Sequence, residues 1–137
     1  MNSKEISRKS GLPISTIRYY EKIELIPSPL RKSNGYRDYD EDVLFLLRII
    51  KKLTYLGFSL REIKEILNFI QIHSNISDNL DYIQDILEQK NKEILERQAQ
   101  LKLISDQLAD IKEKEKFEGC PIKKAVKKIL NIFLKKA

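Results

Sequence analysis

Residues 11–39 read GLPISTIRYYEKIELIPSPLRKSNGYRDY, and this stretch decides the fold. A tight turn is expected at the Gly and Pro that open it, and Ile14, Ile17 and Tyr20 then recur at the spacing of one helical face. The seven residues before the turn are also expected to form a short helix. The order helix, short turn, helix is the helix-turn-helix pattern, in which the second helix is narrow enough to enter the major groove of DNA.

The second half of the stretch predicts a β-hairpin. Pro27 and Pro29 end helical structure, and residues 31–39 then place an Asn34-Gly35 turn between alternating side chains. We therefore expect a β-hairpin directly after the helix-turn-helix.

Two further helices complete the first domain. Asp40 is a good N-cap for a helix that runs to about Leu56 and is stopped by Gly57. Ser59 and Glu62 form a capping box that starts the next helix. Residues 1–71 are thus expected to form one compact domain, and the fold class is mainly α.

The apolar spacing changes in the next segment, residues 72–113. From Ile76 onward the apolar residues alternate between steps of four and three, which is a heptad seam broken at Lys90 and Arg97. About 36 residues at roughly 1.5 Å each predict a rod of roughly 50 Å, whose seam a lone helix cannot bury. The predicted dimerisation residues are Leu80, Ile83, Leu87, Ile94, Leu101, Ile104, Leu108 and Ile111. Folding back onto the N-terminal domain is the alternative, but that domain is too small to shield so long a stripe, so we expect a homodimer.

The last segment, residues 114–137, is predicted to hold a loop and a short amphipathic helix that opens at Pro121. The polar face of this helix is rich in lysine. Binding to a membrane surface is one interpretation. Packing against the rod is the interpretation we prefer, because polar faces of small helices are often Lys-rich, and no membrane partner is expected.

Composition narrows the class of protein. There are 26 Lys and Arg against 20 Asp and Glu, an excess that suits a polyanionic partner but is common among other proteins too. The one cysteine cannot form an internal disulfide, and the N-terminal residues lack the apolar core of a signal peptide, so a cytoplasmic location is expected. With one His, no Gly-rich phosphate loop and no clustered carboxylates, the chain is not expected to be an enzyme or to need a cofactor.

Three motifs in this order carry a family resemblance. They are IRYYE at residues 17–21, NGYRDY at residues 34–39 and LGFSLREI at residues 56–63. Together they closely resemble the MerR family of transcription regulators. The resemblance covers about residues 1–70, and the long helix beyond matches in architecture only. It implies that residues 1–71 form a winged helix-turn-helix DNA-binding domain, in which the hairpin is the wing.

The resemblance implies a regulator that binds dyad-symmetric promoter DNA as a homodimer joined by an antiparallel coiled coil. It implies that the dimer distorts the promoter spacer so that RNA polymerase can engage the promoter, in response to an effector that binds near the end of the coiled coil. The residues expected to bind DNA are Ser15, Thr16, Arg18, Tyr19 and Tyr20 on the recognition helix and Tyr36, Arg37 and Tyr39 on the wing. Tyr20 suits the core equally well, and Tyr36 and Tyr39 suit a role in bracing the wing better than direct contact with DNA. Lys52 and Tyr55 are further candidates for flanking phosphates.

One position departs from the family pattern. Pro13 stands where the family often has Ser or Thr to cap the recognition helix, and Pro offers no side-chain oxygen. Ser15 or water would then have to supply the cap.

The effector stays open. Cys120 resembles the second cysteine of a metal-binding loop in metal-sensing relatives, but Lys112 and Ser74 stand where such relatives carry further cysteines, so no metal site is expected. The alternatives are a redox or electrophile switch at Cys120, an unreactive cysteine, a small organic effector, or none. The rival function is a structural or protein-interaction coiled coil that does not bind specific DNA sequences.

Overall fold

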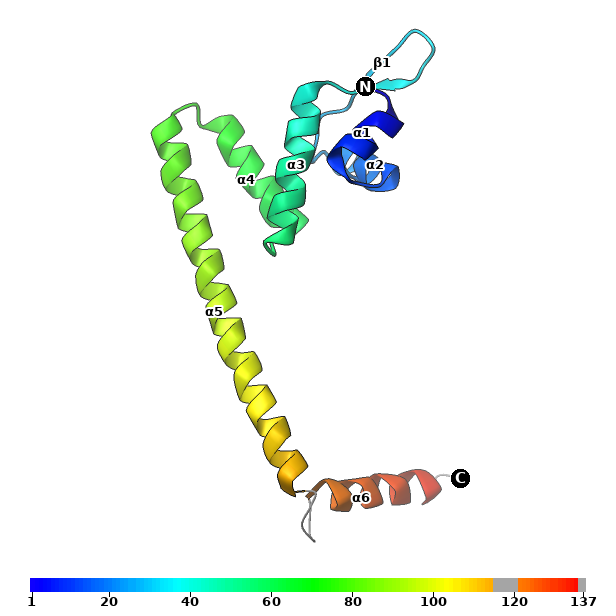
Figure 1. Ribbon diagram of the computed structural model, residues 1–137, viewed down its shortest axis with the longest axis vertical. Coiled ribbons are helices and arrows are strands. Elements are labelled where there is room, and N and C mark those ends of the chain that lie inside the picture. Colours follow the sequence, from blue (N-terminus) through cyan, green and yellow to red (C-terminus); the bar gives the residue numbers. More distant parts are fainter. Residues whose placement is uncertain (115–120, 136–137) are drawn as a thin grey trace. The chain divides into compact units, whose positions relative to one another are not determined.

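The computed structural model describes residues 1–114 and 121–135. Within these residues the chain forms six helices and one two-stranded antiparallel sheet (Figure 1). The chain divides into two units, residues 1–81 and residues 82–137. The predicted fold class, mainly α with an N-terminal winged helix-turn-helix and a long helix, is confirmed.

The helix-turn-helix consists of α1 (Ser3–Ser10) and α2 (Ile14–Lys22). Helix α1 begins one residue earlier than expected because Asn2 and Glu5 form a reciprocal capping box. Gly11 ends α1 in the left-handed conformation, with φ 70°, which a residue without Cβ adopts at little cost. Pro13 is the N-cap of α2 and makes no side-chain cap hydrogen bond, as its missing oxygen predicts.

The wing is the hairpin of β1 (Leu30–Arg31) and β2 (Arg37–Asp38), which Figure 1 shows extending away from the helices. Arg31 pairs with Arg37 in the sheet, and the Lys32 N–H donates to the Tyr36 carbonyl at 2.9 Å. Three residues therefore form the loop, and Gly35 is the left-handed one, with φ 81°. This geometry is typical of a three-residue hairpin loop, not of a two-residue Asn-Gly turn.

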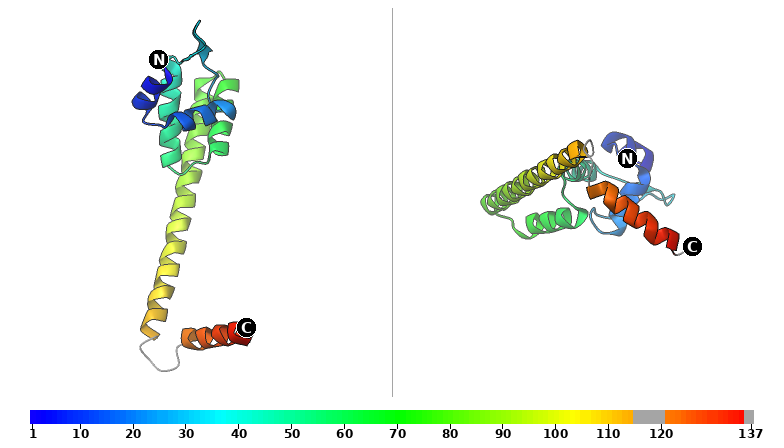
Figure 2. Two further views of the ribbon diagram at one scale, coloured as in Figure 1. Left: turned by 90° about the vertical axis from the view of Figure 1, so that its right-hand side faces the viewer. Right: turned by 90° about the horizontal axis from the view of Figure 1, so that it is seen from below.

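Helices α3 (Glu41–Tyr55) and α4 (Leu60–Ile72) support the helix-turn-helix. The predicted N-caps are present, since Asp40 accepts from the Val43 N–H and Ser59 forms a capping box with Glu62. Helix α1 packs against α2 and α3, and α3 packs against α4, as the two views of Figure 2 also show.

The core of the first unit lies between these helices. A buried aliphatic side chain stabilises the fold by about 1.5–3 kcal/mol relative to an exposed one, so a handful of such residues fixes the arrangement. The largest fully buried side chains come from all four helices and are Ile6, Ile17, Leu47, Ile50 and Ile63.

The second unit contains most of α5 (Ile76–Lys114) and all of α6 (Pro121–Lys135). Helix α5 is one continuous helix of 39 residues, slightly longer than the predicted seam. Helix α6 begins at Pro121 as predicted and carries its lysines on one face. None of the helices in the described ranges is long and apolar enough to cross a membrane.

Candidate nucleic-acid interface

Helix α2 is held on the rest of the domain by two lysines. Lys64 of α4 donates to the Ile23 carbonyl at the end of α2 at 2.7 Å. Lys51 of α3 donates to the Gly11 carbonyl, between α1 and α2, at 3.2 Å. Cations suit these places because the last carbonyls of a helix lack partners within it. The two bonds fix the orientation of the helix-turn-helix on α3 and α4.

The outward face of α2 is polar and cationic. Arg18 is exposed, Tyr19 is 51% exposed, Ser15 is exposed and Thr16 is half-buried. Arg18 forms no ion pair with any carboxylate in the described part of the chain. An exposed, unpaired guanidinium is free to form a bidentate contact with guanine or with a phosphate.

Two predicted DNA contacts are corrected by their burial. Tyr20 is only 6% exposed and Tyr39 only 3% exposed, so both rings belong to the core. Tyr20 shares the inner face of α2 with Ile17, and Tyr39 follows β2 with its hydroxyl directed at Glu21. Because so little of either side chain is exposed, we do not propose that Tyr20 or Tyr39 contacts DNA directly.

Glu21 joins the wing to α2. Its Oε2 accepts from Arg37 Nε at 3.1 Å, and its Oε1 accepts from the Tyr39 hydroxyl. Burial, and then the hydrogen bond to the Glu21 carboxylate, raise the pKa of Tyr39 to about 12. Arg37 therefore anchors the wing as well as lying near the surface. Glu21 was not among the functional residues predicted from the sequence, although an acidic residue inside an otherwise basic and aromatic motif was the available signal.

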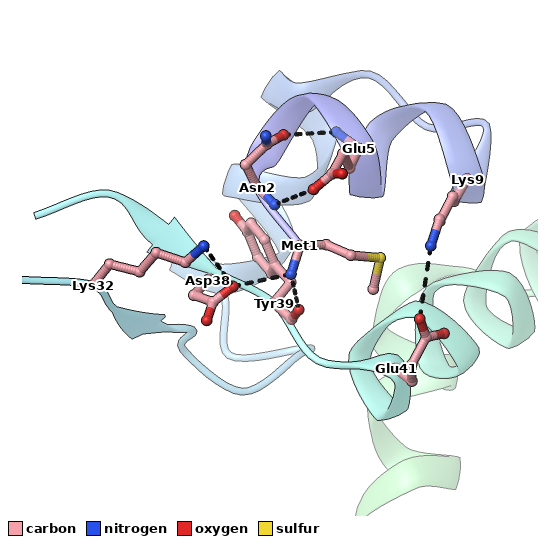
Figure 3. A network of polar contacts seen from close by, with 8 residues as sticks. All are labelled: Met1, Asn2, Glu5, Lys9, Lys32, Asp38, Tyr39 and Glu41. Atoms are coloured by element: carbon pink, nitrogen blue, oxygen red, sulfur yellow. Dashed lines mark hydrogen bonds and ion pairs between the residues drawn. The ribbon is translucent and has the colours of Figure 1, made fainter. Parts of the chain in front are cut away.

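The base of the wing is also bound to the first residue. The Met1 amino group donates to Asp38 Oδ1 at 2.9 Å and to the Tyr39 carbonyl at 2.6 Å (Figure 3). The hydrogen bond from this ammonium group lowers the pKa of Asp38. Lys32 lies 3.8 Å from the same carboxylate, so Asp38 links the wing to the first residue of the chain.

The tip of the wing is exposed. Tyr36 is 71% exposed, and Lys32 and Asn34 are exposed beside it. A groove runs between this tip, α2 and the start of α1, and Arg18, Tyr36 and Arg37 all contribute to its lining. The structure thus brings Arg18, Tyr36 and Arg37 together. Lys52 and Tyr55 are exposed at the end of α3 and do not line this groove.

The predicted dimerisation seam is uncovered in the single chain. Apart from Ile83, which is half-buried, every one of its residues is exposed; Leu101 is 52% exposed. Lys90, at a break in the seam, forms an ion pair with Glu93 at 3.0 Å. Such a stripe of apolar side chains is a surface that calls for a partner.

The structure describes some, but not all, of the positions considered for an effector site. Cys120 lies outside the described residues. Among residues 1–114 and 121–135, no group of three His, Cys, Asp or Glu is arranged to hold a metal ion. The one histidine of the sequence, His73, is therefore not part of such a group. It lies at the end of α4, where its ring stacks on Phe69 at a centroid distance of 3.9 Å and its Nδ1 contacts the Phe69 carbonyl at 3.0 Å.

Comparison with known proteins gives one consistent result. Residues 1–70 match the family model of the MerR HTH family regulatory protein, and residues 46–111 match the model described as MerR, DNA binding. The mercuric resistance operon regulatory protein of Bacillus cereus is 36% identical over 123 residues, which are 89% of this chain and 86% of that protein.

Solved structures of the same kind are similar in fold. The dual function transcriptional regulator MerR of Bacillus megaterium MB1, in complex with mercury(II), has a TM-score of 0.69 at 29% identity, over 88% of this chain and 94% of that one. HiNmlR, a MerR family regulator lacking the sensor domain and bound to promoter DNA, has a TM-score of 0.60 at 24% identity, over 85% of this chain and 93% of that one. The second of these likenesses concerns the fold alone.

Proposed function

The chain belongs to the MerR family of DNA-binding transcription regulators, and from this premise we propose that it binds a dyad-symmetric promoter operator as a homodimer and controls transcription by distorting the promoter spacer. The observation that carries the proposal is the shared surface of α2 and the wing. Arg18 is exposed and unpaired there, and the Glu21–Arg37 ion pair fixes the wing beside it.

In this proposal α2 enters the major groove. Arg18 and Tyr19 reach base edges or phosphates, Ser15 and Thr16 contact the strand near the start of the helix, and Tyr36 of the wing contacts the adjacent backbone. Arg37 positions the wing and adds positive charge. Tyr20 and Tyr39 act only through the packing of the domain.

The two-fold symmetry of the dimer matches the two-fold symmetry of the operator. The exposed seam of α5 pairs with that of a second copy in an antiparallel coiled coil, which places one DNA-binding domain at each half-site. At roughly 1.5 Å per residue, a helix of 39 residues is about 60 Å long and is long enough to separate two half-sites. Specificity then rests on half-site spacing and DNA deformability as well as on base contacts.

RNA polymerase at the distorted promoter is the second partner, and an effector near the end of the coiled coil biases the two states of the dimer. No catalytic chemistry is needed for this role, and its place is the cytoplasm. Mercury sensing is not carried over from the relatives, because Cys120 is the one cysteine of the sequence, and Lys112 and Ser74 stand where metal-sensing relatives carry further cysteines. A redox switch at Cys120, an organic effector and effector-free binding remain the alternatives.

Binding of the purified protein to DNA tests the proposal. Operator fragments are selected from random DNA and from the region upstream of the gene, and affinity is measured against salt concentration by fluorescence anisotropy. We expect a dyad-symmetric site, a steep fall in affinity with salt, and enhanced cleavage at the spacer in footprinting. Equal, weak binding to all sequences would favour the rival interpretation, a coiled-coil interaction protein.

Arg18→Ala is the matching variant. It should weaken operator binding and reduce discrimination between sequences while leaving the mass of the dimer unchanged. Arg61→Ala removes a cation that is exposed on α4, outside the groove, and is the control. If Arg18→Ala binds the operator as the wild type does, the assignment of α2 as recognition helix is wrong.

A further inference from the structure

The groove beside α2 contains cations that neither the motifs nor the family resemblance single out. It is lined by the first residues of α1, by one side of α2 and by the tip of the wing. Lys4 enters from α1 and Lys32 from the wing, next to Arg18 and Arg37. We define these four side chains as the cationic groove.

The charges in the cationic groove are poorly neutralised. No carboxylate is among the residues that line it. Lys4 and Arg18 form no ion pair in the described part of the chain. Lys32 contacts Asp38 only at 3.8 Å with both side chains largely open to solvent, and such a surface pair contributes little. Arg37 alone of the four is firmly bound, to Glu21 at 3.1 Å.

The positive charge of the groove favours an anionic ligand. Its location beside the surface proposed to contact DNA favours a DNA phosphate. The groove is continuous with Arg18 and Tyr36, the surface proposed above to contact DNA. Amide groups of Asn2 and Asn34 add hydrogen-bonding capacity at its rim. A phosphodiester carries one negative charge and accepts hydrogen bonds on two free oxygens, which suits lysine ammonium groups approaching from two elements.

We propose that the cationic groove binds the DNA backbone strand beside the recognition helix, with Lys4 and Lys32 as its phosphate ligands. This inference rests on the proposed function and deepens it. Lys32 exchanges its weak contact with Asp38 for a phosphate, and Asp38 keeps its bond from the Met1 amino group. Because phosphates carry no sequence information, the two lysines fix the register and depth of α2 in the major groove without reading bases.

The salt dependence of operator binding tests the proposal. Each lost phosphate contact lowers the magnitude of the slope of log K against log salt by about 0.9. A dimer on a dyad-symmetric site loses two contacts for each substituted lysine, so Lys4→Ala should lower this magnitude by about two and the Lys4→Ala, Lys32→Ala double variant by about four. Affinity at moderate salt should fall roughly five- to tenfold per lysine, equally for operator and unrelated DNA. Lys4→Arg keeps the charge and should restore the slope.

A second measurement locates the contact. In ethylation interference, wild-type binding should be blocked by ethylating specific phosphates that flank the bases protected by α2. For Lys4→Ala, ethylation at one of these positions should no longer matter. Arg61→Ala, which removes one exposed charge elsewhere in the same unit, should keep the wild-type slope and interference pattern.

The outcomes separate this inference from the function. A wild type that binds an operator, together with a Lys4→Ala variant of unchanged slope and unchanged interference, overturns the cationic groove and leaves the regulator intact. If Lys4→Ala changes the preferred sequence instead of the overall affinity, the lysine reads bases and the phosphate assignment is wrong. A wild type without operator preference overturns the proposed function itself. Unchanged circular dichroism verifies that the variants fold, as expected for an exposed Lys4.

Discussion

The Arg37 guanidinium lies 3.1 Å from the Glu21 carboxylate, so an ion pair joins the wing to the helix that carries Arg18. Both side chains are shielded, with 27% and 10% of their surfaces exposed. Glu21 also accepts a hydrogen bond from the buried Tyr39. One carboxylate thus sets the position of the wing relative to α2.

The coupling between Glu21 and Arg37 can be measured with a double-mutant cycle. Replacing Glu21 by Ala leaves the guanidinium and the Tyr39 hydroxyl without their acceptor, and should lower the free energy of unfolding by about 1–3 kcal/mol. The coupling energy from chemical denaturation of both single variants and the double variant should reach about 1 kcal/mol or more. The wing of Glu21→Ala should also be cleaved faster in limited proteolysis.

A matched control for this cycle lies on α4. Arg61 and Glu65 are 3.7 Å apart, with 91% and 66% of their side chains exposed. Such an exposed pair, four residues apart on one helix, is worth about 0.3–0.5 kcal/mol. If the Glu21–Arg37 coupling is no larger than the Arg61–Glu65 coupling, the anchoring role of Glu21 is refuted.

The pKa of Tyr39 predicts a loss of stability at high pH. Its value in the folded protein is about 12, against 10.0 for the free group. Because the folded state favours the protonated hydroxyl, the stabilisation is complete below pH 10 and is lost as the pH rises from 10 towards 12. The loss is at most about 3 kcal/mol, since one pKa unit corresponds to about 1.4 kcal/mol.

Tyr39→Phe should remove this part of the pH dependence. The measurement is the free energy of unfolding in urea at several pH values between neutral and strongly alkaline, for wild type and variant. The difference between the two proteins should shrink as the pH rises. Tyr55→Phe removes a hydroxyl from a side chain that is 88% exposed and should follow the wild type. A constant difference between wild type and Tyr39→Phe at all pH values would contradict the assignment.

The sequence predicted most of the fold because its local signals agree with one another. The Asp40 N-cap, the stop at Gly57 and the Ser59–Glu62 capping box each act within a few residues, and they marked the two ends of α3 and the start of α4 to within one or two residues. The seam of α5 was readable for the same reason, as a repeat within one helix.

The side-chain contacts of the candidate interface could not be predicted from such local signals. Whether Tyr39 points inward depends on Glu21, which lies 18 residues away in the chain. The cationic groove likewise joins Lys4, Arg18 and Lys32 from three elements. Spacing along the chain predicts which face of a helix a residue occupies, but not which side chains from other elements meet it.

The backbone conformation of Glu24 indicates a position where a substitution should stabilise the folded protein. It follows α2 with φ 58°, a left-handed conformation that costs an ordinary L-residue about 1–2 kcal/mol. Asn tolerates this region, so Glu24→Asn should raise the free energy of unfolding by up to about 1 kcal/mol. Glu24→Val should lower it, because a β-branched side chain is strained there. Thermal unfolding of the wild type, Glu24→Asn and Glu24→Val measures this order of stability. The reverse order would show that contacts of the Glu24 side chain outweigh its backbone strain.

A substitution at Leu101 tests the expected dimer. Its side chain is 52% exposed in the single chain and lies on the apolar seam of α5. In a two-fold dimer each substitution acts twice, so Leu101→Asp places two carboxylates in one apolar interface, where an unpaired charge costs several kcal/mol. We expect sedimentation analysis to show a dimer for the wild type and a monomer for the variant at the same concentration.

Gln100→Asp is the control for Leu101→Asp, because it adds the same charge at the neighbouring position outside the seam. It should remain dimeric. Operator affinity should follow the oligomeric state: a monomer engages one half-site, so Leu101→Asp should bind far more weakly to the full dyad yet bind an isolated half-site as the wild-type domain does. A Leu101→Asp protein that sediments as a dimer would show that α5 does not pair through this seam. In that case another surface must join the two DNA-binding domains, because the dyad requires both.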